Sequence, residues 1–234
     1  MDVEVCIDSV EGTIVASKYG AKRVELCSAL SEGGLSPSLA MIEACVNNST
    51  AEVFVMIRPS AGGFNYTEAE LELMERDIRA ASSVGAHGVV FGVLNGLNEV
   101  DIKANLFLIE TAMELKLGTT FHRAIDLCSD VEKALEGLIN LGFDRVLSSG
   151  GCSNAAKGLE RIKKMVECAQ GSIEIMAGAG VDAENVLEII SSGVDAVHFT
   201  AKKRIDEDLA LDMGPKYVVD DEKIREIIAL TALI

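Results

Sequence analysis

The sequence predicts a (β/α)₈ barrel, an α/β fold formed here by a single domain that spans residues 1–234. Three observations support this fold. Short apolar runs alternate with longer amphipathic segments along the chain, which is typical of parallel strands connected by helices. There are eight such runs, which is the strand number of the barrel. No Pro-, Gly- or Ser-rich linker divides the chain, and 234 residues is close to the usual length of one barrel.

The expected strands are short segments in which β-branched residues alternate with other side chains. They lie at Val3–Asp8, Arg23–Cys27, Val53–Arg58, Gly88–Leu94, Thr119–Asp126, Arg145–Ser149, Ser172–Gly178 and Ala196–Thr200. Helix signals lie between them. For example, Thr67 and Glu70 form a capping motif that opens a helix, and Gly85 ends it. The least regular part is Lys202–Asp221, a long connection before a final helix at Glu222–Ile234.

Composition and charge exclude several classes of function. The chain carries a net charge of −16, so a nucleic-acid backbone or an anionic membrane surface would repel it. It has no run of about 18 uncharged apolar residues, so we expect no membrane span. The N-terminus starts with strand-like alternation instead of a signal peptide. The six cysteines form no CxxC pair, which favours reduced thiols and a cytoplasmic location.

The alternation along each strand predicts which side chains point into the barrel. Successive side chains lie on opposite faces of a strand, and the β-branched face should pack against the helices. The other face then points toward the barrel axis. On five strands it carries polar or ionisable groups, namely Cys6, Asp8, Glu25, Cys27, Arg58, His122, Asp126, His198 and Thr200. Burial of so many such groups is costly unless they bind something or pair internally, as Arg58 could with Glu25 or Asp8.

Several motifs in one register resemble the CutC copper homeostasis protein family. They are VEVCIDS at 3–9, RVELCSALSEGGLSPS at 23–38, VMIRP at 55–59, GVVFGVL at 88–94, TFHRAID at 120–126, GFDRVLSSGG at 142–151 and the strand of His198. The resemblance implies a (β/α)₈ barrel and a role in copper homeostasis. It also implies Cu(I) as the metal, because the family's proposed Cu(I) ligands are the cysteines that match Cys6 and Cys27.

The chemistry of the two cysteines is compatible with this implication. Cys6 and Cys27 lie on the inward faces of adjacent parallel strands, whose backbones run about 4.8 Å apart. Cu(I) is a soft ion that accepts thiolate ligands. The alternative is that both are packing residues, because free cysteine behaves as a small buried hydrophobe.

The same face of the barrel also fits an enzyme that acts on a small anionic metabolite, for example a phosphorylated one. Catalytic groups in this fold lie at the carboxyl ends of several strands. The candidates are His122, Glu25, Arg58, Asp126, His198 and Asp8. His122 would act as general acid or base, its protonation state set by Asp126 or Glu25, and Arg58 would clamp the anion.

Two glycine-rich loops are candidates for an anion cradle. Gly150 and Gly151 follow the sixth strand, while Gly178 and Gly180 belong to the seventh strand and its loop. Backbone N–H groups of such loops bind anions. The usual phosphate site of this fold follows strands seven and eight, so the match is partial. A binding protein without turnover would use the same pocket, and the sequence leaves these alternatives open, together with that of a homodimer.

Overall fold

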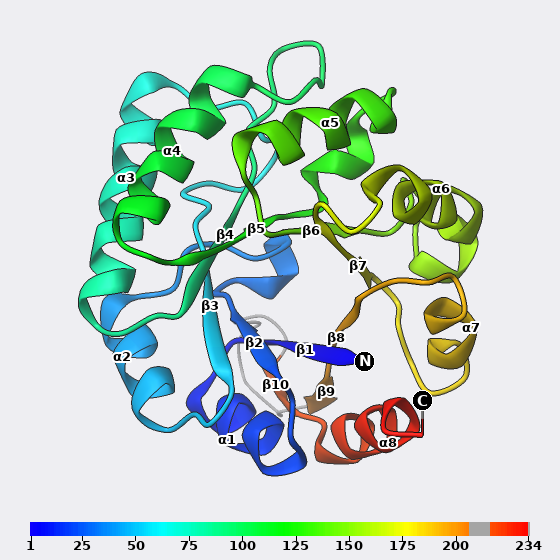
Figure 1. Ribbon diagram of the computed structural model, residues 1–234. Coiled ribbons are helices and arrows are strands. Elements are labelled where there is room, and N and C mark those ends of the chain that lie inside the picture. Colours follow the sequence, from blue (N-terminus) through cyan, green and yellow to red (C-terminus); the bar gives the residue numbers. More distant parts are fainter. Residues whose placement is uncertain (206–215, 234) are drawn as a thin grey trace.

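In the computed structural model, which describes residues 1–205 and 216–233, eight parallel strands close into a barrel surrounded by helices (Figure 1). The strands are β1 (Asp2–Ile7), β2 (Arg23–Leu26), β3 (Glu52–Met56), β4 (Gly88–Phe91), β5 (Gly118–Phe121), β6 (Arg145–Ser148), β7 (Glu174–Gly178) and β8 (Ala196–Thr200). Their order in the barrel follows the chain, and β1 pairs with β8 to close the ring. The predicted (β/α)₈ fold is confirmed.

The helices pack around the strands in chain order. They are α1 (Val10–Tyr19), α2 (Leu39–Asn47), α3 (Glu68–Ser83), α4 (Ile102–Glu114), α5 (Val131–Leu141), α6 (Leu159–Ala169), α7 (Val186–Ile190) and α8 (Asp221–Thr231). The predicted cap of α3 is present, since Thr67 and Glu70 hydrogen-bond to each other's backbone. In Figure 1, α8 lies between α7 and α1 and completes the outer ring. No helix of the described part of the chain is long and apolar enough to cross a bilayer.

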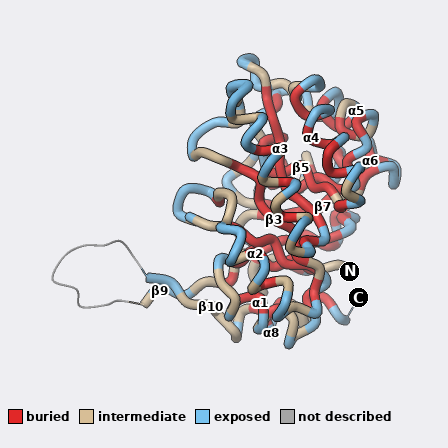
Figure 2. Tube along the Cα trace, turned by 90° about the vertical axis from the view of Figure 1, so that its left-hand side faces the viewer, coloured by how far each residue is buried: buried red, intermediate tan, exposed pale blue. Residues whose placement is uncertain are grey.

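The outward faces of the strands form the main apolar core, as the alternation predicts. Val5, Val24, Val53 and Val55 are completely buried between the barrel and its helices. Figure 2 shows this pattern, with buried chain along the strands and exposed chain on the outer sides of the helices. Branched aliphatic side chains suit such a parallel sheet, because both of its faces are covered.

The amino-terminal part of the barrel interior is filled by Phe54 and charged side chains. Arg23 donates from Nε to Glu4 Oε2 at 3.2 Å, and its guanidinium lies 6.0 Å from the Phe54 ring centre. Gly88 and Gly118 make room for this ring. A Cβ at Gly88 would lie 2.3 Å from the nearest ring atom, and a Cβ at Gly118 would lie 2.7 Å from the nearest one. Because this end is filled, a ligand site inside the barrel has room only at the carboxyl end of the strands.

Several expected strand ends were wrong. We expected the fifth strand to reach Asp126, but β5 ends at Phe121 and the chain turns into a short 3₁₀ helix at Arg123–Leu127. The cause is local hydrogen bonding, because the His122 ring accepts from the Ala124 N–H and so draws the backbone out of the sheet. The third strand was also expected to be longer: β3 ends at Met56, so Arg58 lies in the following loop.

The irregular connection at residues 202–221 contains structure that was not expected. Strands β9 (Lys202–Ile205) and β10 (Lys216–Val219) pair in antiparallel fashion. Figure 2 shows this pair at the end of the molecule opposite the two chain termini. Residues 206–215 of that connection and the end of the expected final helix at residue 234 lie outside the described residues. The final helix, α8, begins at Asp221 with Asp220 as its cap.

Candidate functional site

A cavity of about 410 Å³ lies at the carboxyl ends of the barrel strands. Six of the eight predicted metal-ligating or catalytic residues line it together: Cys6, Glu25, Cys27, Arg58, His122 and His198. They come from β1, β2, β8 and the segments that directly follow β2, β3 and β5. Alternation along the strands accounts for the inward positions of Cys6, Glu25 and His198.

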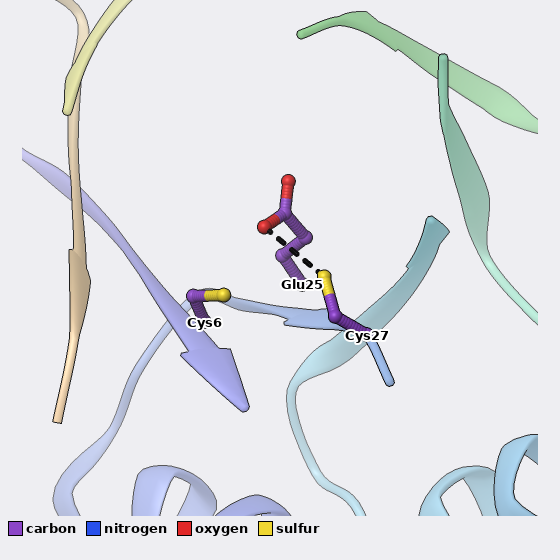
Figure 3. A group of neighbouring side chains, drawn as sticks. All are labelled: Cys6, Glu25 and Cys27. Atoms are coloured by element: carbon purple, nitrogen blue, oxygen red, sulfur yellow. Dashed lines mark hydrogen bonds between the residues drawn. The ribbon is translucent and has the colours of Figure 1, made fainter. Parts of the chain in front are cut away.

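Cys6 and Cys27 are buried free thiols that face the Glu25 carboxyl group (Figure 3). Cys6 is paired in register with Glu25 on the neighbouring strand. Cys27 Sγ lies 3.6 Å from Glu25 Oε2. One potential ligand atom from each of these three residues lies within 4.8 Å of the other two. Two sulfur atoms and one oxygen atom are therefore close enough to contact a single metal ion.

The electrostatics of this group favour a thiolate at Cys6. The adjacent Cys27 thiol is the largest influence on the pKa of Cys6, and together with His198 it holds that pKa well below the usual value in spite of burial. The pKa of Cys27 is raised well above its usual value, because Cys6 accepts its proton in a hydrogen bond and because it is buried. Burial and the neighbouring Cys6 raise the pKa of Glu25 well above its usual value.

His198 is oriented by Glu4, a residue that we did not single out from the sequence. The His198 Nδ1 atom lies 2.8 Å from Glu4 Oε1, and its Nε2 atom lies 3.7 Å from Glu25 Oε2. Burial lowers the pKa of His198, but Glu25, Cys6 and Glu4 outweigh it and raise the pKa well above the usual value. Glu4 shares the inward face of β1 with Cys6, and this alternation was the signal that could have identified it.

Arg58 does not form the internal ion network that was considered as an alternative. Its Nη1 donates to the carbonyl oxygens of Glu32 and Gly34, each at 2.9 Å, and its Nη2 donates to that of Gly62 at 2.9 Å. Its Nε has no hydrogen-bond partner. Among the described residues, no carboxylate lies within salt-bridge distance of it, whether from Glu25 or from Asp8. The guanidinium charge is thus buried against carbonyl groups, the Phe64 ring and the Tyr66 hydroxyl.

His122 is not the acid or base near neutral pH that we expected. Its ring is buried, and burial, followed by the positive charge of Arg58, lowers its pKa to about 3. Its Nδ1 accepts a hydrogen bond from the Ala124 N–H, and its Nε2 has no partner within residues 1–205 and 216–233. Neither Asp126 nor Glu25 controls its protonation state through a hydrogen bond.

Two of the expected catalytic carboxylates lie outside the cavity. Asp8 is exposed just after β1. Asp126 accepts hydrogen bonds from the Ser148 hydroxyl at 2.6 Å and from the Gly151 N–H at 3.0 Å. The expected anion cradle at Gly150 and Gly151 is therefore already filled by a carboxylate of the protein, and the Gly150 N–H donates to the Ser148 hydroxyl.

The second glycine-rich loop is closer to the cavity. Gly178 ends β7 beside His198: a Cβ there would lie 3.1 Å from its ring. Gly180 lines the cavity and has a positive φ of 65°. It is the one member of the predicted glycine set that lines the cavity.

Three basic residues line the cavity without having been predicted, namely Arg123, Lys202 and Lys223. Arg123 directly follows His122, so the motif could have indicated it. Lys223 comes from α8, far along the chain, and donates to the Thr200 carbonyl oxygen at 3.0 Å. No local pattern connects a residue on the last helix with the end of β8.

The chain is similar to a defined protein family over most of its length. The family model described as the CutC family matches residues 1–203. A CutC protein of Vibrio campbellii is 47% identical over 201 residues, which is 86% of this chain and 81% of that protein. One of Glaesserella parasuis is 39% identical over the full length of both chains.

Solved structures agree with this similarity. The crystal structure of a CutC protein from Streptococcus agalactiae, provisionally assigned to copper homeostasis, has a TM-score of 0.80 and 34% identity, and covers 85% of this chain and 98% of its own. A thiamine phosphate pyrophosphorylase from Pyrococcus furiosus has a TM-score of 0.63 at 16% identity and covers 100% of this chain and 97% of its own. The second likeness concerns the barrel fold alone.

Proposed function

This chain belongs to the CutC family, and we propose that it serves copper homeostasis by binding Cu(I) through Cys6 and Cys27. One observation carries the proposal: two buried thiols and the Glu25 carboxyl place their ligand atoms within 4.8 Å of one another. Cu(I) is soft and prefers thiolate ligands. The lowered pKa of Cys6 supports the proposal, because a thiolate is the form that binds metal. Such thiols must stay reduced, which fits a role in the cytoplasm.

The proposal is tested by anaerobic Cu(I) titration against a competing chelator. We expect about one Cu(I) per chain in the wild type. We expect at least a roughly 100-fold loss of affinity when Cys6→Ser and Cys27→Ser are combined, because hard hydroxyl groups replace the soft ligands. The matched control combines Cys152→Ser and Cys168→Ser, two cysteines that do not line the cavity. Unchanged binding in the Cys6/Cys27 variant would exclude this site.

A second candidate function is favoured by the charge of the cavity lining. The chain has 37 acidic and 21 basic residues. The cavity, in contrast, is lined by four basic side chains, Arg58, Arg123, Lys202 and Lys223, and by one carboxyl group, Glu25. Arg123 is paired with Asp126 at 2.8 Å, so the excess is carried by Arg58, Lys202 and Lys223. A two-thiolate metal site has no need of this excess. We therefore also propose that the cavity binds a small anionic metabolite, as an enzyme or as a binding protein.

A metabolite screen by thermal shift, run with and without Cu(I), tests the second candidate. A ligand that binds the native state raises its melting temperature. We expect stabilisation by small organic anions and none by their neutral amide analogues. If no anion stabilises the protein in either condition, the second candidate is excluded and the Cu(I) proposal is unaffected.

A further inference from the structure

Two buried N–H donors in the cavity have no acceptor in the described part of the chain. The first is Arg58 Nε, and the second is His122 Nε2. Both side chains are only 4% exposed, and both line the cavity. A buried donor without a partner costs about 1–3 kcal/mol, so native proteins rarely contain two of them in one place. Their position indicates that something outside the chain accepts their hydrogen bonds.

The hydrogen bonds of His122 determine which of its nitrogen atoms carries the proton. Its Nδ1 accepts from the Ala124 N–H at 3.3 Å and therefore carries no hydrogen of its own. In a neutral imidazole the other nitrogen is then protonated. His122 Nε2 is consequently an N–H donor, and its unmet partner must be an acceptor.

One aromatic ring contacts both side chains, and they are near enough for the Arg58 charge to act on His122. The Arg58 guanidinium lies 5.2 Å from the Phe64 ring centre, and the His122 ring lies 4.6 Å from the same centre. Gly92 leaves the space that His122 occupies, because a Cβ there would lie 2.8 Å from His122 Nδ1. These contacts fix the orientation of both side chains before any ligand binds, which lowers the entropic cost of binding.

The Tyr66 hydroxyl lies near the Arg58 guanidinium, but neither its oxygen nor Arg58 Nε has a hydrogen-bond partner among the described residues, so one edge of the guanidinium stays available. Both hydrogens of Nη1 are used by the carbonyl oxygens of Glu32 and Gly34, while Nη2 makes one bond, to Gly62, and Nε none. A role limited to holding these loops would account for the three carbonyl contacts. It would not account for the free Nε or for the absence of a counter-ion among the described residues.

We propose that Arg58 and His122 together bind one oxyanion group, a carboxylate or phosphate, of a small molecule held in the cavity. Arg58 donates from its Nε edge and supplies the charge, and His122 donates from Nε2 as a neutral group. The excess of basic residues around the cavity adds long-range attraction. This inference rests on the second candidate function and names the residues that recognise its ligand.

The inference is tested by calorimetric titration of the metal-free, reduced protein with inorganic phosphate and, separately, with malonate. We expect at least one of the two anions to bind. We expect Arg58→Met and His122→Leu each to weaken binding about tenfold or more, since each removes one bond to a charged acceptor. His122→Gln, which retains an N–H donor, should recover part of the loss. Binding of phosphate alone or of malonate alone identifies the oxyanion.

Two further measurements separate recognition from a structural role. The histidine control is His87→Gln, because His87 also accepts a backbone N–H, that of Val53, but lies at the opposite end of the barrel. In ¹⁵N NMR, the Nε2–H resonance of His122 should shift when the anion is added. If anions bind but folded Arg58→Met and His122→Leu proteins bind them equally well, this inference fails and the second candidate stands. If neither anion binds, this inference is overturned, and the broader anion screen decides the second candidate.

Discussion

His122 shows how burial determines what a single residue can do. A histidine at the carboxyl end of a barrel strand is expected to exchange protons near neutral pH. Here, burial and the nearby Arg58 charge lower its pKa to about 3, so it stays neutral over the physiological range. Acid–base chemistry in the cavity would then fall to Glu25, whose pKa is raised well above its usual value, mainly by burial.

The lowered pKa of His122 predicts a specific dependence of stability on pH. The unfolded chain takes up a proton at this residue near pH 6.5, whereas the folded chain does so only near pH 3. Above pH 6.5 the titration of His122 does not change the free energy of unfolding. As the pH falls from 6.5 toward 3, it lowers the free energy of unfolding, because only the unfolded chain takes up the proton. Between about pH 6 and 4, the free energy of unfolding should fall by about 1.4 kcal/mol per pH unit because of this group.

The measurement compares urea unfolding of the wild type and His122→Gln at several pH values. Gln does not titrate, so the free energy of unfolding of the wild type minus that of the variant should fall as the pH is lowered from 7 to 4. Parallel curves for the two proteins, or an NMR titration midpoint of His122 above pH 5, would contradict the assignment.

At the scale of the elements, β4 and β5 begin with glycines because Phe54 of β3 occupies the space beside them. A Cβ at Gly88 would lie 2.3 Å from the Phe54 ring, and one at Gly118 would lie 2.7 Å from it. The same ring contacts the guanidinium of Arg145 at 5.4 Å. These residues fill the amino end of the barrel interior and confine the cavity to the opposite end.

We expect Gly88→Ala to destabilise the protein by about 1–3 kcal/mol, because the added methyl group overpacks the barrel interior. The ring of Phe54 must move, and the surrounding side chains leave little room for it. Phe54→Leu should recover part of the cost, so the double variant should be more stable than the sum of the single variants predicts, by about 0.5–3 kcal/mol. The check is a double-mutant cycle from denaturant unfolding, and simple additivity would contradict the packing argument.

The strands could be predicted because their alternation is local. The end of β5 was misplaced because a turn-forming hydrogen bond from the Ala124 N–H to the His122 ring overrides that alternation, whereas the position of the Asp126 side chain is decided by contacts distant in sequence. The inward positions of Cys6 and Glu25 follow from the side-chain period of a strand. Asp126 was placed wrongly because its partners, such as the Ser148 hydroxyl, lie on another strand. Lys223 was missed for the same reason, since only the closed ring of helices brings it to the end of β8.

On the scale of the whole molecule, the charge is unevenly distributed. The chain has a net charge of −16, yet four basic side chains and one carboxyl group line the cavity, with Arg123 paired to Asp126 outside the lining. Low-dielectric walls focus the field of such a group of charges. If the proposed anion is the ligand, the acidic exterior would repel large polyanions, while the basic residues of the cavity would attract a small anion that can enter it. Such a distribution of charge would select ligands by size as well as by sign.

The last helix lies beyond the segment matched by the family model, which ends at residue 203, yet it packs into the buried core of the protein. Helix α8 closes the outer ring between α7 and α1, and Ile224 and Ile227 on it are completely buried. We expect Ile227→Ala to lower the free energy of unfolding by about 2–5 kcal/mol through the cavity that it leaves.

The control for this prediction lies only a few residues away, because Leu233 is 80% exposed. Leu233→Ala should change the free energy of unfolding by less than about 0.5 kcal/mol, since a surface substitution loses few contacts. Both variants are compared with the wild type by urea unfolding followed by circular dichroism. If α8 contributed nothing to the stability of the barrel, the two variants would unfold at the same urea concentration. A single transition that moves to lower urea only in Ile227→Ala would show that the last helix belongs to the same cooperative unit as the barrel.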